Sequence, residues 1–151
     1  MPAGNDPVAG DPLVSFNFGL DLSGAVVGYF TEVSGLGSET EVIEHKIVKD
    51  GKEIVRKIPG RLKWGDITLK RGITASMDIW DWRKEVEDGQ VGGARRAGSV
   101  YMLDQEGGEV ARWNFEAGWP SKVSGPSIKS DSNEIGIEEL VIVHEYITRV
   151  T

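Results

Sequence analysis

The chain has no cysteine among its 151 residues. That absence excludes disulfide bonds, thiolate nucleophiles and most structural zinc sites, and it fits a protein made in a reducing cytoplasm. Histidine is scarce too, because His45 and His144 are the only two. No apolar run approaches the roughly 18–20 residues of a membrane-spanning helix, so we expect no stable membrane insertion. No charged and then apolar leader is present, so no secretory signal is predicted.

Charge is distributed unevenly along the chain. The formal net charge is −7, yet residues 44–73 hold nine Lys/Arg against four Asp/Glu, a net +5, and the remainder holds eight against twenty, a net −12. An acidic body does not suit a nucleic-acid reader, whose contact face is basic. The basic segment predicts either a solvated loop or an arm that grips an acidic surface, such as that of another copy.

The pattern of apolar residues predicts one β-rich domain. Residues 1–12 are rich in Gly, Pro, Asp and Ala and are expected to form a flexible N-terminal arm, with the single domain spanning 13–151. Alternation of apolar and polar residues predicts strands over 13–21, 29–33, 39–48, 63–71, 99–103, 109–117 and 134–150. A switch of apolar parity in the last strand predicts a β-bulge near Glu138 and Glu139. Residues 49–60 are predicted to be a loop with bends at Asp50-Gly51 and Pro59-Gly60.

A single helix is predicted over residues 76–88. Thr74 or Ser76 is its expected N-cap and Gly89 its expected end. Its apolar stripe consists of Met77, Ile79, Trp80, Trp82 and Val86. The predicted fold class is therefore mainly β, an antiparallel β-sandwich or barrel with one α-helix.

The search for chemistry predicts no catalytic residue, no cofactor site and no metal site. His45 and His144 lie in strands far apart in sequence, and ordinary strand histidines explain them better than metal ligands. Asp78, Asp81 and Glu85 share one helix face, which a solvated surface explains more simply than a carboxylate pair for acid–base catalysis. We therefore expect no enzyme. The alternative from another class is a small β-rich metal-binding or hydrolase domain using the two histidines.

Short motifs recur in order along the chain. They are Phe16-Asn17-Phe18, residues 28–36 (GYFTEVSGL), Lys57-Ile58-Pro59-Gly60, residues 67–73 (ITLKRGI), Trp80-Asp81-Trp82, Trp113-Asn114-Phe115 with Trp119-Pro120, and Asn133-Glu134-Ile135 leading to His144-Glu145. As an ordered set they resemble the tail tube proteins of contractile-tailed phages and the inner tube proteins of phage-like contractile injection systems. Similarity to the hemolysin-coregulated protein of type VI secretion is more distant. The arm before Leu13 departs from the family pattern.

The resemblance implies a tail-tube-like fold and a structural role. Hexameric rings would stack into a rigid hollow tube inside a contractile sheath, as a conduit for cargo or for DNA bound without sequence specificity. The implied partners are further copies of the chain, the sheath protein, and baseplate and terminator proteins. Assembly would take place in the cytoplasm, and the protein would be found in the tail of a phage or phage-like particle, released from the cell in some systems. A tail terminator or baseplate ring protein is the alternative.

Within that picture, the basic segment supplies the expected contact between subunits or rings. Lys52, Arg56 and Lys57 would meet acidic surface on a neighbour. Exposed charge pairs contribute only about 0–1 kcal/mol each, so apolar neighbours are needed as well. These are Ile54, Val55, Ile58 and Pro59, with Glu145 and Arg149 as further contact candidates in the last strand. The lumen is expected to be acidic or neutral, because the body carries the net −12.

Overall fold

Residues 18–126 and 136–151 are described by the computed structural model. The predicted arm at 1–12 and the domain boundary at residue 13 lie outside these ranges. The elements in chain order are β2 (Phe18–Leu22), β3 (Ala25–Phe30), β4 (Glu32–Ser34), β5 (Ser38–Lys49), β6 (Lys52–Trp64), β7 (Ile67–Gly72), α1 (Asp78–Glu87), α2 (Val91–Ala94), β8 (Arg96–Leu103), β9 (Glu109–Ser124), β10 (Ile137–Val143) and β11 (Tyr146–Arg149). Within the described residues, no helix is long and apolar enough to cross a membrane.

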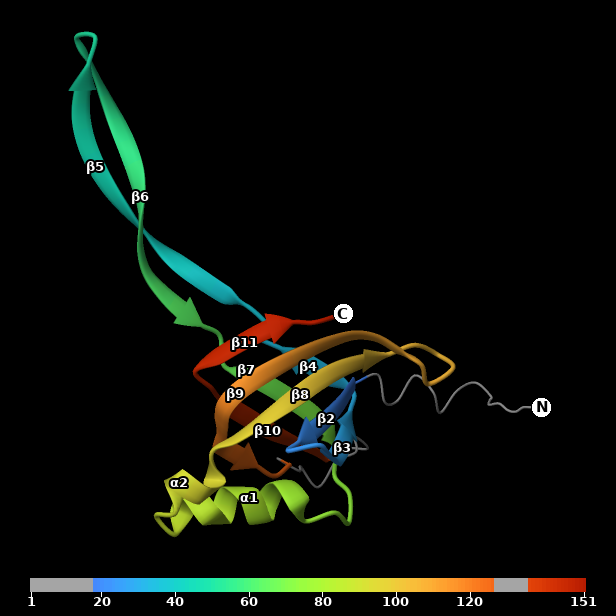
Figure 1. The fold of residues 1–151 in the computed structure, drawn as a ribbon. Coiled ribbons are helices and arrows are strands. Elements are labelled where there is room, and N and C mark those ends of the chain that lie inside the picture. The colour runs from blue at the N-terminus through green and yellow to red at the C-terminus, as the bar shows by residue number, and fades with distance from the viewer. Residues whose placement is uncertain (1–17, 127–135) are drawn as a thin grey trace, which may run out of the picture.

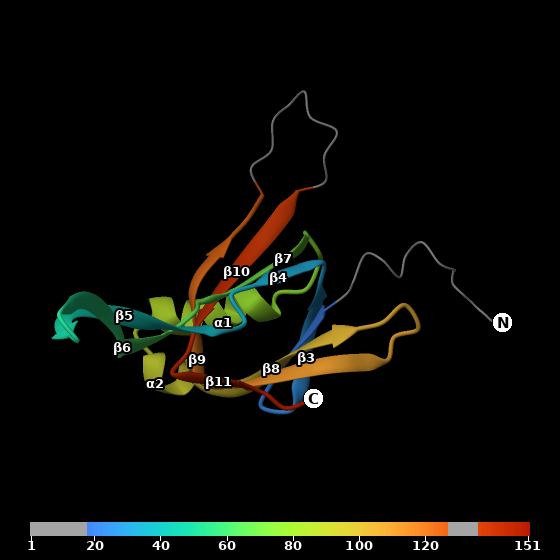
Figure 2. The same cartoon turned by 90° about the horizontal axis from the view of Figure 1, so that it is seen from above.

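Eight of the strands form one curled antiparallel sheet. Its order is β3-β2-β8-β9-β10-β7-β4, and β11 also pairs with β9. The 16-residue strand β9 runs through both layers, since its first part pairs with β8 and β11 and its last part with β10 (Figures 1 and 2). At the other side Thr31 joins β3 to β4, and its backbone N–H and its hydroxyl both donate to the carbonyl of Lys70. The result confirms the predicted β-sandwich or barrel with one main helix.

The core lies between the two layers and is closed at one end by α1 (Figure 1). Its fully buried apolar side chains are Leu20, Phe30, Ile67, Leu69, Ile79, Ala94, Val100, Phe115, Leu140 and Ile142. The indole of Trp82 is also buried and donates to the carbonyl of Ala94 at 2.7 Å. Gly89 follows the helix with φ of +84°, as predicted for its end. Met77 occupies the N-cap without a side-chain bond and is 60% exposed, so its predicted place in the apolar stripe is wrong.

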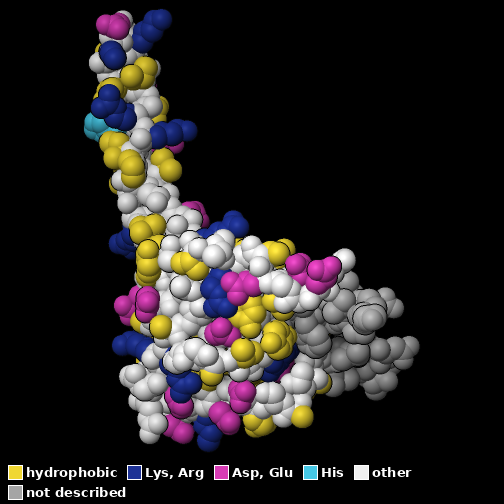
Figure 3. Space-filling model, turned by 45° about the vertical axis from the view of Figure 1, so that its right-hand side comes forward, with side chains coloured by type: hydrophobic (Ala, Val, Ile, Leu, Met, Phe, Trp, Pro, Cys, Tyr) yellow, Lys and Arg dark blue, Asp and Glu magenta, His cyan; other side chains and the backbone are white. Residues whose placement is uncertain are grey.

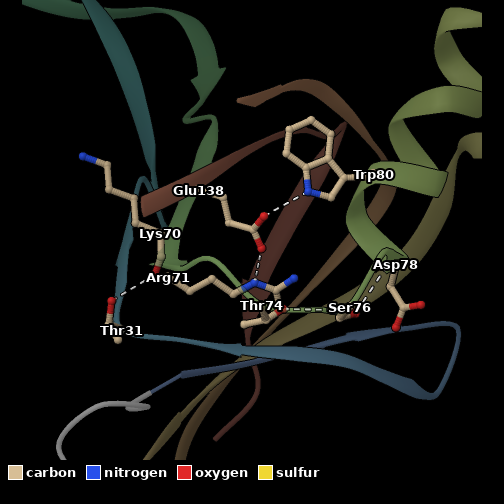
Figure 4. Close-up of polar contacts among 8 residues, drawn as sticks. All are labelled: Thr31, Lys70, Arg71, Thr74, Ser76, Asp78, Trp80 and Glu138. Atoms are coloured by element: carbon tan, nitrogen blue, oxygen red, sulfur yellow. Dashed lines mark hydrogen bonds and ion pairs between the residues drawn. The ribbon is translucent and has the colours of Figure 1, made fainter. Parts of the chain in front are cut away.

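A buried ion pair ties four elements together (Figure 4). The Arg71 Nε of β7 donates to Glu138 Oε1 of β10 at 2.7 Å, and the two side chains are 3% and 0% exposed. The second carboxylate oxygen accepts from Trp80 Nε1 of α1 at 2.9 Å. The guanidinium also lies over the ring of Phe30 in β3, 4.7 Å from its centroid. This network holds the helix against both layers.

Two predictions about the strands are wrong. Residues 52–60 belong to strand β6, so the predicted loop at 49–60 shrinks to the turn at Asp50 and Gly51. The parity of the last strand switches at residues 144–145, where the chain breaks between β10 and β11, and not at Glu138. The register irregularity of β10 against β9 falls between Val141 and Ile142. In both cases the pairing with a neighbouring strand decides where a strand bends or ends. The sequence of one strand alone does not show in which register it pairs with its partner.

Gly35 is the glycine for which the fold leaves least room. Its φ is +86°, and a Cβ there would clash with the carbonyl oxygen of Asp66. We expect Gly35→Ala to lower the free energy of unfolding by about 2 kcal/mol or more, since both backbone conformation and space oppose a side chain. Gly37→Ala is the matched control, because nothing lies within 4 Å of the added methyl group. Urea denaturation of the unassembled chain would measure both, and equal stability of the two variants would contradict the expectation.

Candidate assembly surface

The β5–β6 hairpin projects away from the sheet layers (Figure 1). Its turn has two central residues with positive φ, Asp50 at +53° and Gly51 at +74°. Such Asp-Gly turns match the right-handed twist of paired strands, which is why residues before and after it pair in register, with Lys49 opposite Lys52. From Ser38 to Lys63 every residue is exposed except Ile47 and Gly60, which are half-buried. Among residues 18–126 and 136–151, no other element therefore covers this two-stranded sheet.

The predicted contact residues of the basic segment all lie on β6. Apolar side chains stand exposed on it, with Ile54, Val55 and Ile58 exposed by 40%, 46% and 39%. Lys52, Arg56, Lys57 and Pro59 are exposed beside them. In Figure 3 basic and hydrophobic side chains alternate along the projecting arm. The structure thus brings these seven residues together on one strand.

The two other candidates, Glu145 and Arg149, lie on the body. Glu145 is exposed between β10 and β11, and its backbone N–H donates to the carbonyl of Glu116. The guanidinium of Arg149 lies 5.6 Å from the ring centroid of Trp113, and its Nε donates to the carbonyl of Thr151 at 2.7 Å. Both residues follow β10 in the body and lie outside β5 and β6, so a contact involving them would use a separate surface.

The base of the hairpin is anchored by residues that sequence reasoning missed. The backbone N–H of Gly65 donates to the carbonyl of Gly37, which joins the two ends of the hairpin. His144 lies 2.9 Å through Nε2 from the carbonyl of Gly65 and is only 8% exposed. The ring of Trp64 meets that of Tyr146 edge to face at 5.3 Å. The His144-Glu145 motif was noticed in the sequence as part of the family resemblance. The sequence contains no pattern that predicts the contact of His144 with Gly65.

A polar cluster covers the outer face of the β2–β8–β9 layer. Arg112 donates to Glu109 at 2.7 Å and to Asp21 at 3.4 Å, and its guanidinium lies 4.7 Å from the ring centroid of Tyr101. Burial raises the pKa of the Tyr101 phenol well above its ordinary value, and the carboxylate of Asp21 adds to the rise. The hydrogen bonds from Arg112 lower the pKa of the Glu109 carboxyl, and those to Glu109 raise the pKa of the Arg112 guanidinium.

The residues considered for catalysis do not form a site. His45 is exposed on the hairpin opposite Arg56, whereas His144 is buried at the base. Glu85 binds Arg96 at 2.9 Å and 3.3 Å, so it is not free to pair with the exposed Asp81. Among the described residues no three His, Asp or Glu side chains are grouped to hold a metal ion. In the described part of the chain, these side chains offer surfaces for contact.

Comparisons with known proteins point to one family. The profile of the T4-like virus tail tube protein gp19 family matches residues 14–148. No curated protein sequence matches the chain.

Solved structures share the fold across most of the chain. The sheath-tube complex of the extracellular contractile injection system PVC in its extended state holds a chain with TM-score 0.72 and 23% identity, covering 89% of this chain and 88% of that one. The sheath/tube terminator of the same system gives TM-score 0.73 and 22% identity over 100% of both chains. Hcp1 from Flavobacterium johnsoniae gives TM-score 0.54 and 15% identity, covering 89% of this chain and 94% of that one.

Proposed function

The chain belongs to the T4-like virus tail tube protein family, and from this membership we propose that it assembles into stacked hexameric rings. The rings would form the rigid hollow inner tube of a contractile tail or injection system. The family gives the chain a structural role in a tube. Passage of cargo or DNA through the lumen would need no sequence-specific binding.

The uncovered β5–β6 hairpin is the observation that carries the proposal. An isolated two-stranded hairpin is marginally stable at best in water. This one spans Ser38–Trp64 and exposes apolar side chains along its length, including Val42 at 61%, Val48 at 75% and Leu62 at 52%. Apolar exposure on that scale marks an interaction surface. In a ring or a stack of rings, other copies supply the missing cover.

A free sheet edge supports ring closure. Strand β11 pairs with β9 on one side and has no strand on its other side within the described residues. Unpaired edges pair readily with other chains, and a head-to-tail contact whose rotation closes generates a ring. Glu145 and Arg149 lie at this strand, so we assign them to this second contact and the hairpin residues to the first.

An acidic surface complementary to the basic hairpin lies at the other end of the molecule. A groove of 280 Å³ between α1 and β3 is lined by Asp78 and Asp81, by Glu85 in its ion pair with Arg96, and by apolar Val26 and Val27. Asp78 and Asp81 are the carboxylates there that an incoming basic side chain could meet. Figure 1 places α1 and the hairpin tip at opposite ends. Head-to-tail stacking would therefore bring a basic arm toward an acidic end. This pairing favours open-ended growth over a closed dimer.

Negative-stain electron microscopy of the purified chain over a concentration and salt series tests the proposal. We expect hollow tubes of uniform width that lengthen with concentration and shorten at high salt, because the contact is partly electrostatic. Monomers under every condition would contradict self-assembly of the chain. Addition of baseplate proteins then tests whether growth needs a nucleus.

A terminator or baseplate ring protein is the second candidate. The PVC sheath/tube terminator shares the fold over the whole chain, and a terminator ends a tube. Single rings that never stack, at concentrations where a tube protein would polymerise, would favour it. A metal-binding or hydrolase domain is the third candidate. His45 lies on the projecting part of the hairpin and His144 lies against Gly65 at its base, and this separation argues against one site formed by both histidines.

The proposed partners follow from a place in the tube. They are the contractile sheath outside, the baseplate at one end and the terminator at the other. The particle would be a phage tail or a phage-like injection system, assembled in the cytoplasm. Copurification of the unaltered chain with sheath protein in particle preparations would test this placement.

A further inference from the structure

The hairpin has two faces, and the register assigns each residue to one of them. Residues directly opposite across β5 and β6 share a face, and faces alternate along each strand. One face, called here the basic face, carries Ile43 and Ile58, His45 and Arg56, Ile47 and Ile54, and Lys49 and Lys52. The other, called here the neutral face, carries Val42 and Pro59, Glu44 and Lys57, Lys46 and Val55, and Val48 and Glu53.

Both faces expose apolar side chains, the neutral face more than the basic face, on which Ile47 is half-buried. On the basic face Ile54 is 40% exposed and Ile43 is 52% exposed, and on the neutral face Val55 is 46% and Val42 is 61% exposed. A hairpin with one buried face shows apolar residues on that face and polar residues on the other. Here neither face is polar throughout. If a neighbour covered only one face, the apolar side chains of the other face would stay exposed to water.

The faces differ in charge. The basic face carries Lys49, Lys52 and Arg56 without any carboxylate between Ile43 and Ile58. On the neutral face two lysines are balanced by two glutamates, with Lys46 and Glu53 paired at 3.9 Å. Surfaces that complement these two faces must differ, because the first requires acidic groups and the second does not. One and the same surface patch of a neighbouring copy would therefore not complement both faces.

We propose that the hairpin is covered on both faces in the assembly, the basic face by an acidic surface and the neutral face by an uncharged one, each from another copy of this chain. The inference rests on the proposed function, since it names the partners of the same hairpin. The body supplies the acidic surface, because the chain outside residues 44–73 carries a net −12. The arm would thus lie between two neighbours, not against one.

Single cysteines test the proposal cleanly, because the chain has none of its own. Ile54→Cys and Val55→Cys are a matched pair, adjacent on β6, similarly exposed and on opposite faces. In the unassembled chain we expect a maleimide reagent to label both at similar rates. In tubes we expect both rates to fall by about tenfold or more, as for groups that react only when a packed contact opens.

The possible outcomes separate the inference from the proposed function. Protection of only one of the two cysteines overturns two-sided cover and keeps the hairpin as a contact. Labelling of both at the unassembled rate in intact tubes overturns the hairpin contact itself. A chain that never assembles overturns the proposed function and this inference with it.

Salt dependence tests the difference between the faces. Arg56→Gln and Lys57→Gln each remove one positive charge from neighbouring positions, the first from the basic face and the second from the neutral face. We expect Arg56→Gln to reduce the salt dependence of the assembly threshold and Lys57→Gln to leave it near the unaltered value, because screening acts on unbalanced attraction. Equal salt dependence for the two variants would overturn the assignment of different partner surfaces.

Discussion

A chain carrying both Arg56→Glu and Lys57→Glu is expected to stay folded and to form no tubes at concentrations where the unaltered chain just assembles. The two side chains are exposed on opposite faces of β6, so the double change reaches both proposed contacts. On one face a glutamate would stand among Lys49 and Lys52 and face an acidic neighbour. On the other, it would stand opposite Glu44, where like charges are destabilising. Each reversal recurs in every subunit of a tube.

The expected size of the effect is a rise of at least roughly tenfold in the concentration needed for assembly, equivalent to about 1.4 kcal/mol per added subunit. Folding should lose no more than about 1 kcal/mol, because neither side chain contacts the core and the one new like-charge pair, opposite Glu44, costs at most about that much. Thermal unfolding followed by circular dichroism checks the fold, and negative-stain microscopy checks the tubes. The swap Arg56→Lys with Lys57→Arg keeps both charges and should assemble. Normal tubes from the double glutamate variant would remove the hairpin from the contact.

The hairpin shows what the sequence could and could not predict. Its basic charge, its apolar residues and the bend at Asp50-Gly51 were readable, and with them the idea of an arm for a neighbour. The strand character of 52–60 was missed because Pro59 and Gly60 suggested a second bend. In the structure Pro59 sits opposite Val42, beside a register shift between Thr40 and Val42, where an irregular ladder tolerates a residue without an N–H. Pairing across the hairpin, and not local propensity, keeps the strand going.

The body was predicted in outline because alternation reports burial strand by strand. Ile67 and Leu69 were expected to share a face and are both fully buried. Arg71 lies two residues further on, at the end of the strand predicted over 63–71, and it is buried on the same face with an exposed fraction of 3%. What makes it tolerable is Glu138, which comes from a strand 67 positions away. No local pattern contains that partner, and so the buried pair became visible only in the structure.

Glu138→Ala is expected to have the largest effect on stability. The change would leave the guanidinium of Arg71 buried without its counter-charge, and the Nη2 of that group already has no hydrogen-bond partner among the residues that the structure describes. Breaking a buried pair from one side costs about 3–5 kcal/mol, since the remaining charge cannot regain its hydration. Trp80 would lose its acceptor as well. At roughly 2–4 °C per kcal/mol, the melting temperature should fall by about 10 °C.

Two further variants show whether this loss comes from the buried charge. Glu139→Ala is the matched control, because the next residue in β10 points outward and its carboxylate binds Lys122 at 3.1 Å, where exposed pairs contribute about 0–1 kcal/mol. Arg71→Met combined with Glu138→Leu removes both charges and should be more stable than Glu138→Ala alone, because well-packed apolar side chains replace buried ion pairs at little net cost. Urea denaturation below the assembly threshold measures all three. A loss for Glu138→Ala no larger than for Glu139→Ala would mean that water or another group reaches Arg71, and the network would then position α1 without stabilising the fold.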